Sequence, residues 1–253
     1  MRVMSEYEPD DLFESSFAQD LARETLKVYE RYAVEVVERF GFCPWARAAR
    51  ESGQVTLRVV FSADLGNLDA SLDESLRRLS ELHRQAPPTD IALFIYPLLD
   101  LDRLAFEDYA RRLRQRSEAG PEKLDAFAMA AFHPSASVDL SHPDRLVPYV
   151  RRSPDPTLQL VRNTALSSIK GLTHGTAFLD VSELSVDAFK ALQQPPPKAV
   201  RERIAEQNLA TVRDTGPGTI DAVLSDIARA REAAHDGLLA RYGRRGPRHR
   251  DPG

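Results

Sequence analysis

The chain has 253 residues, of which 42% are apolar and 28% charged, and its formal net charge is −4 at pH 7. This composition supports a folded core and excludes collagen-like, disulfide-stapled and wholly disordered proteins. The charge gives no overall field that would recruit nucleic acid or an anionic membrane, so neither is expected as a partner.

No run of about 18 to 20 apolar residues is present, and the N-terminus is acidic where a signal peptide would be basic. We therefore expect a cytoplasmic protein. Residues 1–14 are predicted to form a disordered acidic terminus and residues 241–253 a disordered basic tail. Residues 15–240 are expected to form a single domain.

Hydrophobic spacing predicts alternating helices and strands in the first half of the chain. A long helix is expected from Ser15 to Gly41, and a second helix is expected to begin at Pro44. The remaining predictions are strands over 55–61, 91–96 and 127–132, a helix after Asn67 that carries Leu68 to Leu82, and a helix over 103–117.

Prolines interrupt the second half, and the stretch from His133 to Pro156 is expected to be a long ordered loop. A helix is then predicted to open at Pro156 and Thr157. The last predictions are a short strand over 176–181 and helices over 198–213 and 219–240. The pattern indicates a single α/β sandwich with a three- to four-stranded sheet, a long N-terminal helix and C-terminal helices.

The only cysteine, Cys43, is the first candidate for chemistry. If Pro44 begins a helix, Cys43 occupies the N-cap, where free N–H groups favour a thiolate. Arg47 on the first turn would add positive charge. The alternative is an inert cysteine packed beside Trp45.

His133 is the second candidate, because it follows directly after a predicted strand. Ligands collect at the carboxyl ends of strands in open α/β sheets, and a histidine there can act as acid, base or metal ligand. The alternative is a histidine that only hydrogen-bonds the loop.

The third candidate is a basic segment that includes Arg151, Arg152, Ser153 and Arg162. Guanidinium groups beside a helix N-terminus favour a carboxylate or phosphate. Adjacent residues point in different directions, so only one of Arg151 and Arg152 is expected to reach a ligand. Asp155 can instead neutralise an arginine, and a solvated loop is the alternative interpretation.

The sequence has no Walker-type loop, G-x-G-x-x-G fingerprint, H-E-x-x-H motif or G-x-S-x-G elbow. Nucleotide hydrolysis, classical dinucleotide binding, zincin chemistry and serine hydrolysis therefore have no motif support.

The motifs in this order resemble the DUF1415 family, bacterial proteins of unknown function. The segments that carry the resemblance are Phe42-Cys43-Pro44-Trp45-Ala46-Arg47, Phe132-His133-Pro134 and Arg152-Ser153-Pro154-Asp155-Pro156-Thr157-Leu158 with Leu160-Val161-Arg162. The similarity covers about residues 20 to 215. The chain departs from the family pattern at Gln159, where relatives usually have histidine, and at Trp45, where they more often have phenylalanine.

Three functions are compatible with these residues. In the first, a small-molecule enzyme, Cys43 is the nucleophile or redox thiol, His133 its acid–base partner, and the arginines hold an anionic substrate. In the second, Cys43, His133 or both ligate haem or a metal. In the third, the protein is a non-catalytic interaction module whose basic tail binds an acidic partner. The resemblance itself implies no activity.

Overall fold

The computed structural model describes residues 15–61, 68–85, 90–120, 126–165 and 200–242. In chain order the elements are α1 (Ser15–Tyr32), the π-helical segment η1 (Ala33–Glu38), α2 (Ala46–Glu51), β1 (Val55–Val59), α3 (Leu68–Arg84), β2 (Ile91–Ile95), α4 (Arg103–Ala119), β3 (Phe127–Phe132), α5 (Pro143–Val150), β4 (Thr157–Arg162), α8 (Val200–Thr215) and α9 (Pro217–Arg241). The predicted α/β fold, with a long N-terminal helix and C-terminal helices, is confirmed.

The four strands form one mixed sheet in the order β1-β2-β4-β3. The strands β1 and β2 are parallel, whereas β4 runs antiparallel to both of its neighbours. In this register Thr157 lies between Ile95 of β2 and Phe132 of β3. The carboxyl ends of β2 and β3 therefore lie at the edge where β4 begins.

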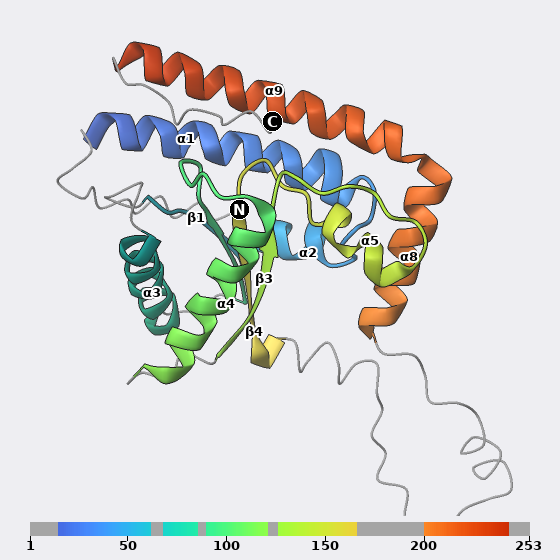
Figure 1. The fold of residues 1–253 in the computed structure, drawn as a ribbon, viewed down its shortest axis with the longest axis horizontal. Coiled ribbons are helices and arrows are strands. Elements are labelled where there is room, and N and C mark those ends of the chain that lie inside the picture. Colours follow the sequence, from blue (N-terminus) through green and yellow to red (C-terminus); the bar gives the residue numbers. More distant parts are fainter. Residues whose placement is uncertain (1–14, 62–67, 86–89, 121–125, 166–199, 243–253) are drawn as a thin grey trace, which may run out of the picture.

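One face of the sheet is covered by α3 and α4 (Figure 1). Side chains alternate between the two faces along a strand, and Leu158 and Leu160 point into this layer together with Phe94 of β2. From the helices, Leu79 and Phe106 are fully buried against them. This layer forms one of the two main apolar clusters that cover the sheet.

The opposite face is covered by α1, α5, α8 and α9, which share a second apolar cluster with Leu57 and Ile95 of the sheet. The long helices α1 and α9 lie side by side (Figure 1), joined by ion pairs between Arg31 and Asp226 and between Arg241 and Asp20. The C-terminal helices are thus an integral layer of the fold.

The first helix ends as its sequence predicts. The last turns of the predicted helix become π-helical in η1, and Gly41 follows with φ 64°. A positive φ is strained for residues that carry a Cβ atom, so glycine is the residue that allows the chain to turn here.

Two predictions for the second half are wrong. The expected loop from His133 to Pro156 contains the helix α5, which begins with Pro143 at its first position and includes Pro148. The expected helix at Pro156 and Thr157 is the strand β4. A short apolar run fits both the 3.6-residue period of a helix and the two-residue period of a strand. Here the alternating Leu158 and Leu160 are buried in a strand that pairs with β2 and β3.

The predicted strand over 176–181 lies outside the described residues, as do Asn67 and both predicted disordered termini apart from Arg241 and Tyr242. Among the residues that the structure describes, no helix is both long enough and apolar enough to cross a bilayer.

Candidate functional site

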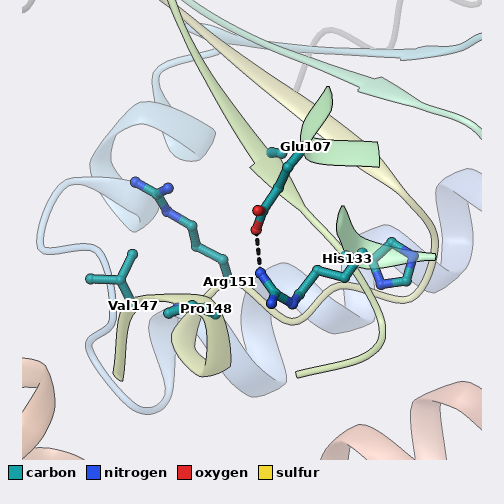
Figure 2. Close-up of a pocket in the computed structure, with 7 residues that line it drawn as sticks. Glu107, His133, Val147, Pro148 and Arg151 are labelled. Carbon is teal, nitrogen blue, oxygen red and sulfur yellow. Dashed lines mark hydrogen bonds and ion pairs between the residues drawn. The ribbon is translucent and has the colours of Figure 1, made fainter. Parts of the chain in front are cut away.

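A small cavity lies just past the carboxyl end of β3, between α4 and α5 (Figure 2). Its volume is about 40 Å³. We call it the His133–Arg151 cavity, and it is lined by Arg103, Glu107, Ala131, His133, Val147, Pro148 and Arg151. It brings together two of the residues predicted from the sequence, His133 and Arg151.

His133 is buried, with 9% of its surface exposed, and both of its ring nitrogens are hydrogen-bonded. Nε2 lies 2.9 Å from the carbonyl oxygen of Leu101, and Nδ1 accepts the backbone N–H of Ser135 at 3.1 Å. These partners assign the proton to Nε2 of a neutral ring. The ring also packs against Phe106. In this geometry His133 connects two loops, and neither nitrogen is free to act as a base.

Arg151 contributes a guanidinium group that has no carboxylate within ion-pair distance in the described part of the chain. The group lies over the ring of Phe132, 5.8 Å from its centroid. The nearby carboxylate of Glu107 pairs instead with Arg103 at 2.5 Å, which is the dashed contact in Figure 2. The cavity lining thus holds two guanidinium groups and one carboxylate, which pairs with Arg103 alone, and its formal charge is +1 with His133 neutral.

Burial lowers the pKa of the Arg151 guanidinium, and repulsion from Arg201 acts in the same direction, while attraction from Glu107 opposes both. An arginine remains protonated at neutral pH despite such a shift, because its ordinary pKa is above 12. The charge is therefore retained in a partly desolvated position, where it interacts more strongly with an anion than it would in water.

Arg152 points away from the cavity and toward α9, so the two adjacent arginines do diverge as predicted. Its Nη1 pairs with the carboxylate of Asp221, and its guanidinium lies over the ring of Tyr149. The Tyr149 hydroxyl donates to the same carboxylate at 3.0 Å. Arg152 therefore binds a carboxylate, but one that belongs to the protein's own C-terminal helix.

Asp155 forms the second contact between α9 and the motif that begins at Arg152 and runs into β4. Its side chain is fully buried, and Oδ1 accepts from Nε of Arg231 at 2.8 Å. Burial raises the pKa of the Asp155 carboxyl, whereas Arg231 acts to lower it. The sequence raised the possibility that Asp155 neutralises an arginine, but nothing in the sequence identified Arg231, 76 residues away.

Hydrogen bonds within the motif fix the turn between Arg152 and β4. Ser153 donates from Oγ to the carbonyl of Asp155 at 2.6 Å, and Tyr29 of α1 donates to the same carbonyl at 3.0 Å. The Tyr29 hydroxyl also contacts the hydroxyl of Thr157. Ser153, predicted to bind substrate, is 4% exposed and serves this turn.

Arg162 lies at the far end of β4 from the cavity. It pairs in register with Phe127, at the start of β3, whereas His133 follows the end of β3. At about 3.3 Å per residue, the two positions are separated by roughly 20 Å along the strand. The guanidinium of Arg162 lies 4.6 Å from the centre of the Phe127 ring. The structure therefore does not bring Arg162 to His133.

Cys43 is not a helix N-cap, which corrects the prediction from Pro44. The helix α2 begins at Ala46 with Trp45 as its N-cap, because Pro44 lies in the preceding turn. The N–H of Ala46 donates to the carbonyl oxygen of Cys43 at 3.2 Å. The backbone N–H groups of Trp45 and Ala46 favour a thiolate, but burial outweighs them and raises the pKa of the Cys43 thiol.

Arg47 is directed toward Glu38, at 3.4 Å, with 68% of its side chain exposed. Glu38 itself is nearly inaccessible, at 3% exposed, and Arg50 binds its other oxygen at 2.5 Å. The carboxylate at the end of η1 is thus held by two arginines of α2, and the turn that carries Cys43 lies between these elements.

The residues on either side of Cys43 line a different cavity from that of His133. Among the described residues, no group of three or more His, Cys, Asp or Glu side chains is arranged to hold a metal ion. Ligation of a metal or haem by His133 would require one of its ring nitrogens to give up a hydrogen bond.

A family model described as "Protein of unknown function (DUF1415)" matches residues 25–176, more than half of the chain. The chain belongs to the DUF1415 family. No curated protein and no solved structure matches it.

The DUF1415 match includes Cys43, Arg152 and every residue that lines the His133–Arg151 cavity. It ends before α8 and α9, so Asp221 and Arg231, which pair with the motif, lie outside it. The departure at Gln159 falls in the middle of the sheet, between Leu93 and Ala130. Since Leu158 and Leu160 face α3 and α4, Gln159 is on the opposite face.

Proposed function

We propose that this protein binds the carboxylate or phosphate group of a small molecule in the His133–Arg151 cavity. The observation that carries the proposal is the guanidinium of Arg151, which is partly buried and has no carboxylate partner in the described structure. A guanidinium fork matches the oxygens of a carboxylate or phosphate, and partial desolvation strengthens the attraction.

The cavity residues have separate roles in this proposal. Arg151 binds the anionic oxygens. Glu107 holds Arg103 at the cavity wall and keeps its own charge neutralised, so it does not repel the ligand. His133 positions the loop after β3 by its two hydrogen bonds. A volume of about 40 Å³ admits only the charged end of a ligand, whose remainder would extend into solvent.

The proposal retains the anionic substrate expected from the sequence but does not assign Cys43 to this cavity. The raised pKa of the Cys43 thiol and the two engaged nitrogens of His133 favour binding over nucleophilic catalysis.

Isothermal titration calorimetry with inorganic phosphate and with succinate tests the proposal. Arg151→Gln should weaken binding by about tenfold, and Arg151→Lys, which keeps the charge but loses the fork, by less. Arg145→Gln is the matched control, because Arg145 lies on α5, the helix that ends just before Arg151, with 71% of its side chain exposed and outside the cavity.

Binding should also weaken with added salt, because an accessible charge is screened. If neither anion binds at low ionic strength, or if Arg151→Gln and Arg145→Gln bind them equally well, the cavity is not an anion site. Circular dichroism of each variant verifies that the fold is retained.

A further inference from the structure

A second cavity lies between the turn that follows η1 and the helix α8. Its volume is about 280 Å³, close to the lower end of the range for small-molecule sites. It is lined by Gly41, Pro44, Trp45, Arg203, Ile204, Gln207 and Asn208, and we call it the Trp45–Asn208 groove. None of these residues takes part in the His133–Arg151 cavity.

Asn208 provides an incompletely satisfied polar group in this groove. The residue is 8% exposed, and its amide Nδ2 donates to the carbonyl of Phe42 over a long 3.4 Å. Its oxygen Oδ1 is buried and has no hydrogen-bond partner in the described structure. A buried carbonyl oxygen without a donor is unfavourable, so this position favours a ligand that supplies an N–H or O–H group.

Trp45 presents a flat apolar surface at the same groove. Its side chain is among the few large apolar ones that are exposed in the described chain, at 37%. An indole ring stacks favourably on another flat ring. The adjacent Ile204 adds a half-buried apolar contact on α8.

Arg203 supplies a positive charge at the groove. It is exposed, and the described residues place no carboxylate within ion-pair distance of it. Five residues separate it from Asn208, which is about 1.4 turns and a rise of about 7.5 Å along α8. A ligand that reaches both must carry a hydrogen-bond donor and a negative group several ångströms apart.

We propose that the Trp45–Asn208 groove binds a planar heteroaromatic or aromatic anion, with its ring on Trp45, a donor group on Oδ1 of Asn208, and its negative group on Arg203. Both a nucleoside monophosphate with an exocyclic amino group and an amino-substituted aromatic carboxylate have this chemistry. The groove shares no lining residue with the His133–Arg151 cavity, so this proposal does not depend on anion binding there.

Trp45 is the only tryptophan in the 253 residues, so the protein's tryptophan fluorescence reports on this groove alone. Adenosine monophosphate is the first probe, and its binding should quench the emission. Adenosine lacks the negative group and ribose 5-phosphate lacks the ring, so each should bind more weakly. Calorimetry with 4-aminobenzoate tests the second ligand class, the amino-substituted aromatic carboxylates.

Arg203→Gln should raise the Kd of whichever probe binds by about threefold to tenfold, through loss of one charged contact. Arg201→Gln is the matched control, because Arg201 is on the same helix, 83% exposed and outside the groove. Asn208→Leu removes the acceptor and should weaken the probes that carry a donor. If Asn208→Leu does not fold, the exposed Arg203 and the adenosine comparison still decide.

Binding of adenosine monophosphate alone would assign the groove to nucleotides, and binding of 4-aminobenzoate alone would assign it to aromatic carboxylates. Both results support the proposal. If neither adenosine monophosphate nor 4-aminobenzoate binds at millimolar concentration, the proposal is overturned. It is also overturned if binding to Arg203→Gln is as tight as binding to Arg201→Gln.

Discussion

Oδ1 of Asp155 lies 2.7 Å from Nη2 of Arg231, which joins the motif before β4 to the C-terminal helix α9. The carboxylate is fully buried, and the same Nη2 donates to the carbonyl of Pro97 at 2.9 Å. One arginine of α9 therefore binds two loops at the carboxyl edge of the sheet.

Replacing Arg231 should be strongly destabilising, because Asp155 would remain buried and unpaired. We expect Arg231→Met to lower the free energy of unfolding by about 3 to 5 kcal/mol in urea denaturation. Arg229→Met, two residues away with a 71% exposed side chain, is the control and should change it by less than about 1 kcal/mol. Asp155→Asn combined with Arg231→Met should cost less than Arg231→Met alone.

The Arg231→Met defect should shrink as the pH falls. Burial already raises the pKa of Asp155, and removal of Arg231 takes away the contact that lowers it. A folded-state pKa above the unfolded value means that the folded state binds the proton first, so acid stabilises the variant relative to the parent. A defect that stays constant from neutral pH down to the pKa of Asp155 would contradict this assignment.

His235 of α9 should make the fold sensitive to acid. It is 6% exposed, and burial together with Arg231 lowers its pKa to about 3. In the unfolded chain His235 is protonated below about pH 6.5, whereas in the folded chain it stays neutral until the pH is much lower. Stability is therefore lost as the pH falls. Between pH 8 and pH 5 this loss amounts to about 2 kcal/mol.

Chemical denaturation across this pH range, in parallel on His235→Gln and the parent, measures the contribution. The variant should show a flatter profile, whereas His83→Gln, an exposed histidine on α3, should follow the parent. Identical slopes for His235→Gln and the parent would show that His235 binds its proton equally well in the folded and unfolded states, which contradicts the lowered pKa.

Cys43 should react slowly with thiol reagents in the folded protein. Burial raises the pKa of its thiol despite the backbone N–H groups of Trp45 and Ala46, so little thiolate exists at pH 7. Labelling with a disulfide reagent should be slower in the native protein than in urea, and should accelerate as the pH rises. Native labelling faster than that of the unfolded chain would restore the nucleophile hypothesis.

Glu38 should control access to Cys43. The pKa of its carboxyl is lowered chiefly by the hydrogen bond from Arg50 and further by Arg47. Glu38→Ala removes the ion pairs that join η1 to Arg47 and Arg50 of α2. It should lower the free energy of unfolding by about 1 to 3 kcal/mol and increase the labelling rate of Cys43. Glu51→Ala is the control, because Glu51 is the last residue of α2 and its side chain is 62% exposed. Equal labelling rates in the two variants would mean that the turn is held by other contacts.

The sequence predicted the strands and helices whose periods are unambiguous. Both α4 and β2 occur where their patterns place them, because one is long and periodic and the other is a continuous apolar run. The strand β4 was misjudged because Leu158, Val161 and Ala165 also fit a helical period. Only pairing with β2 and β3, which is a long-range property, distinguishes the two.

The candidate residues were found by their types, but their directions depend on tertiary contacts. Arg151 and Arg152 are adjacent in sequence, yet one lines a cavity and the other binds Asp221. Arg103 and Glu107 had no distinguishing signal, since an arginine and a glutamate four residues apart are ordinary on a helix surface. Asn208 could not be recognised either, because its importance lies in its burial.

The position of α8 and α9 has a practical consequence for shorter versions of the chain. Leu209, Val212 and Ile220 pack into the same apolar cluster as Val36 and Ile95. A protein truncated at the family boundary, residue 176, would leave that surface uncovered and would also leave Asp155 without its cation. Such a fragment is expected to aggregate on expression. We therefore expect the smallest autonomously folding unit to extend through α9, beyond the segment by which the family is recognised.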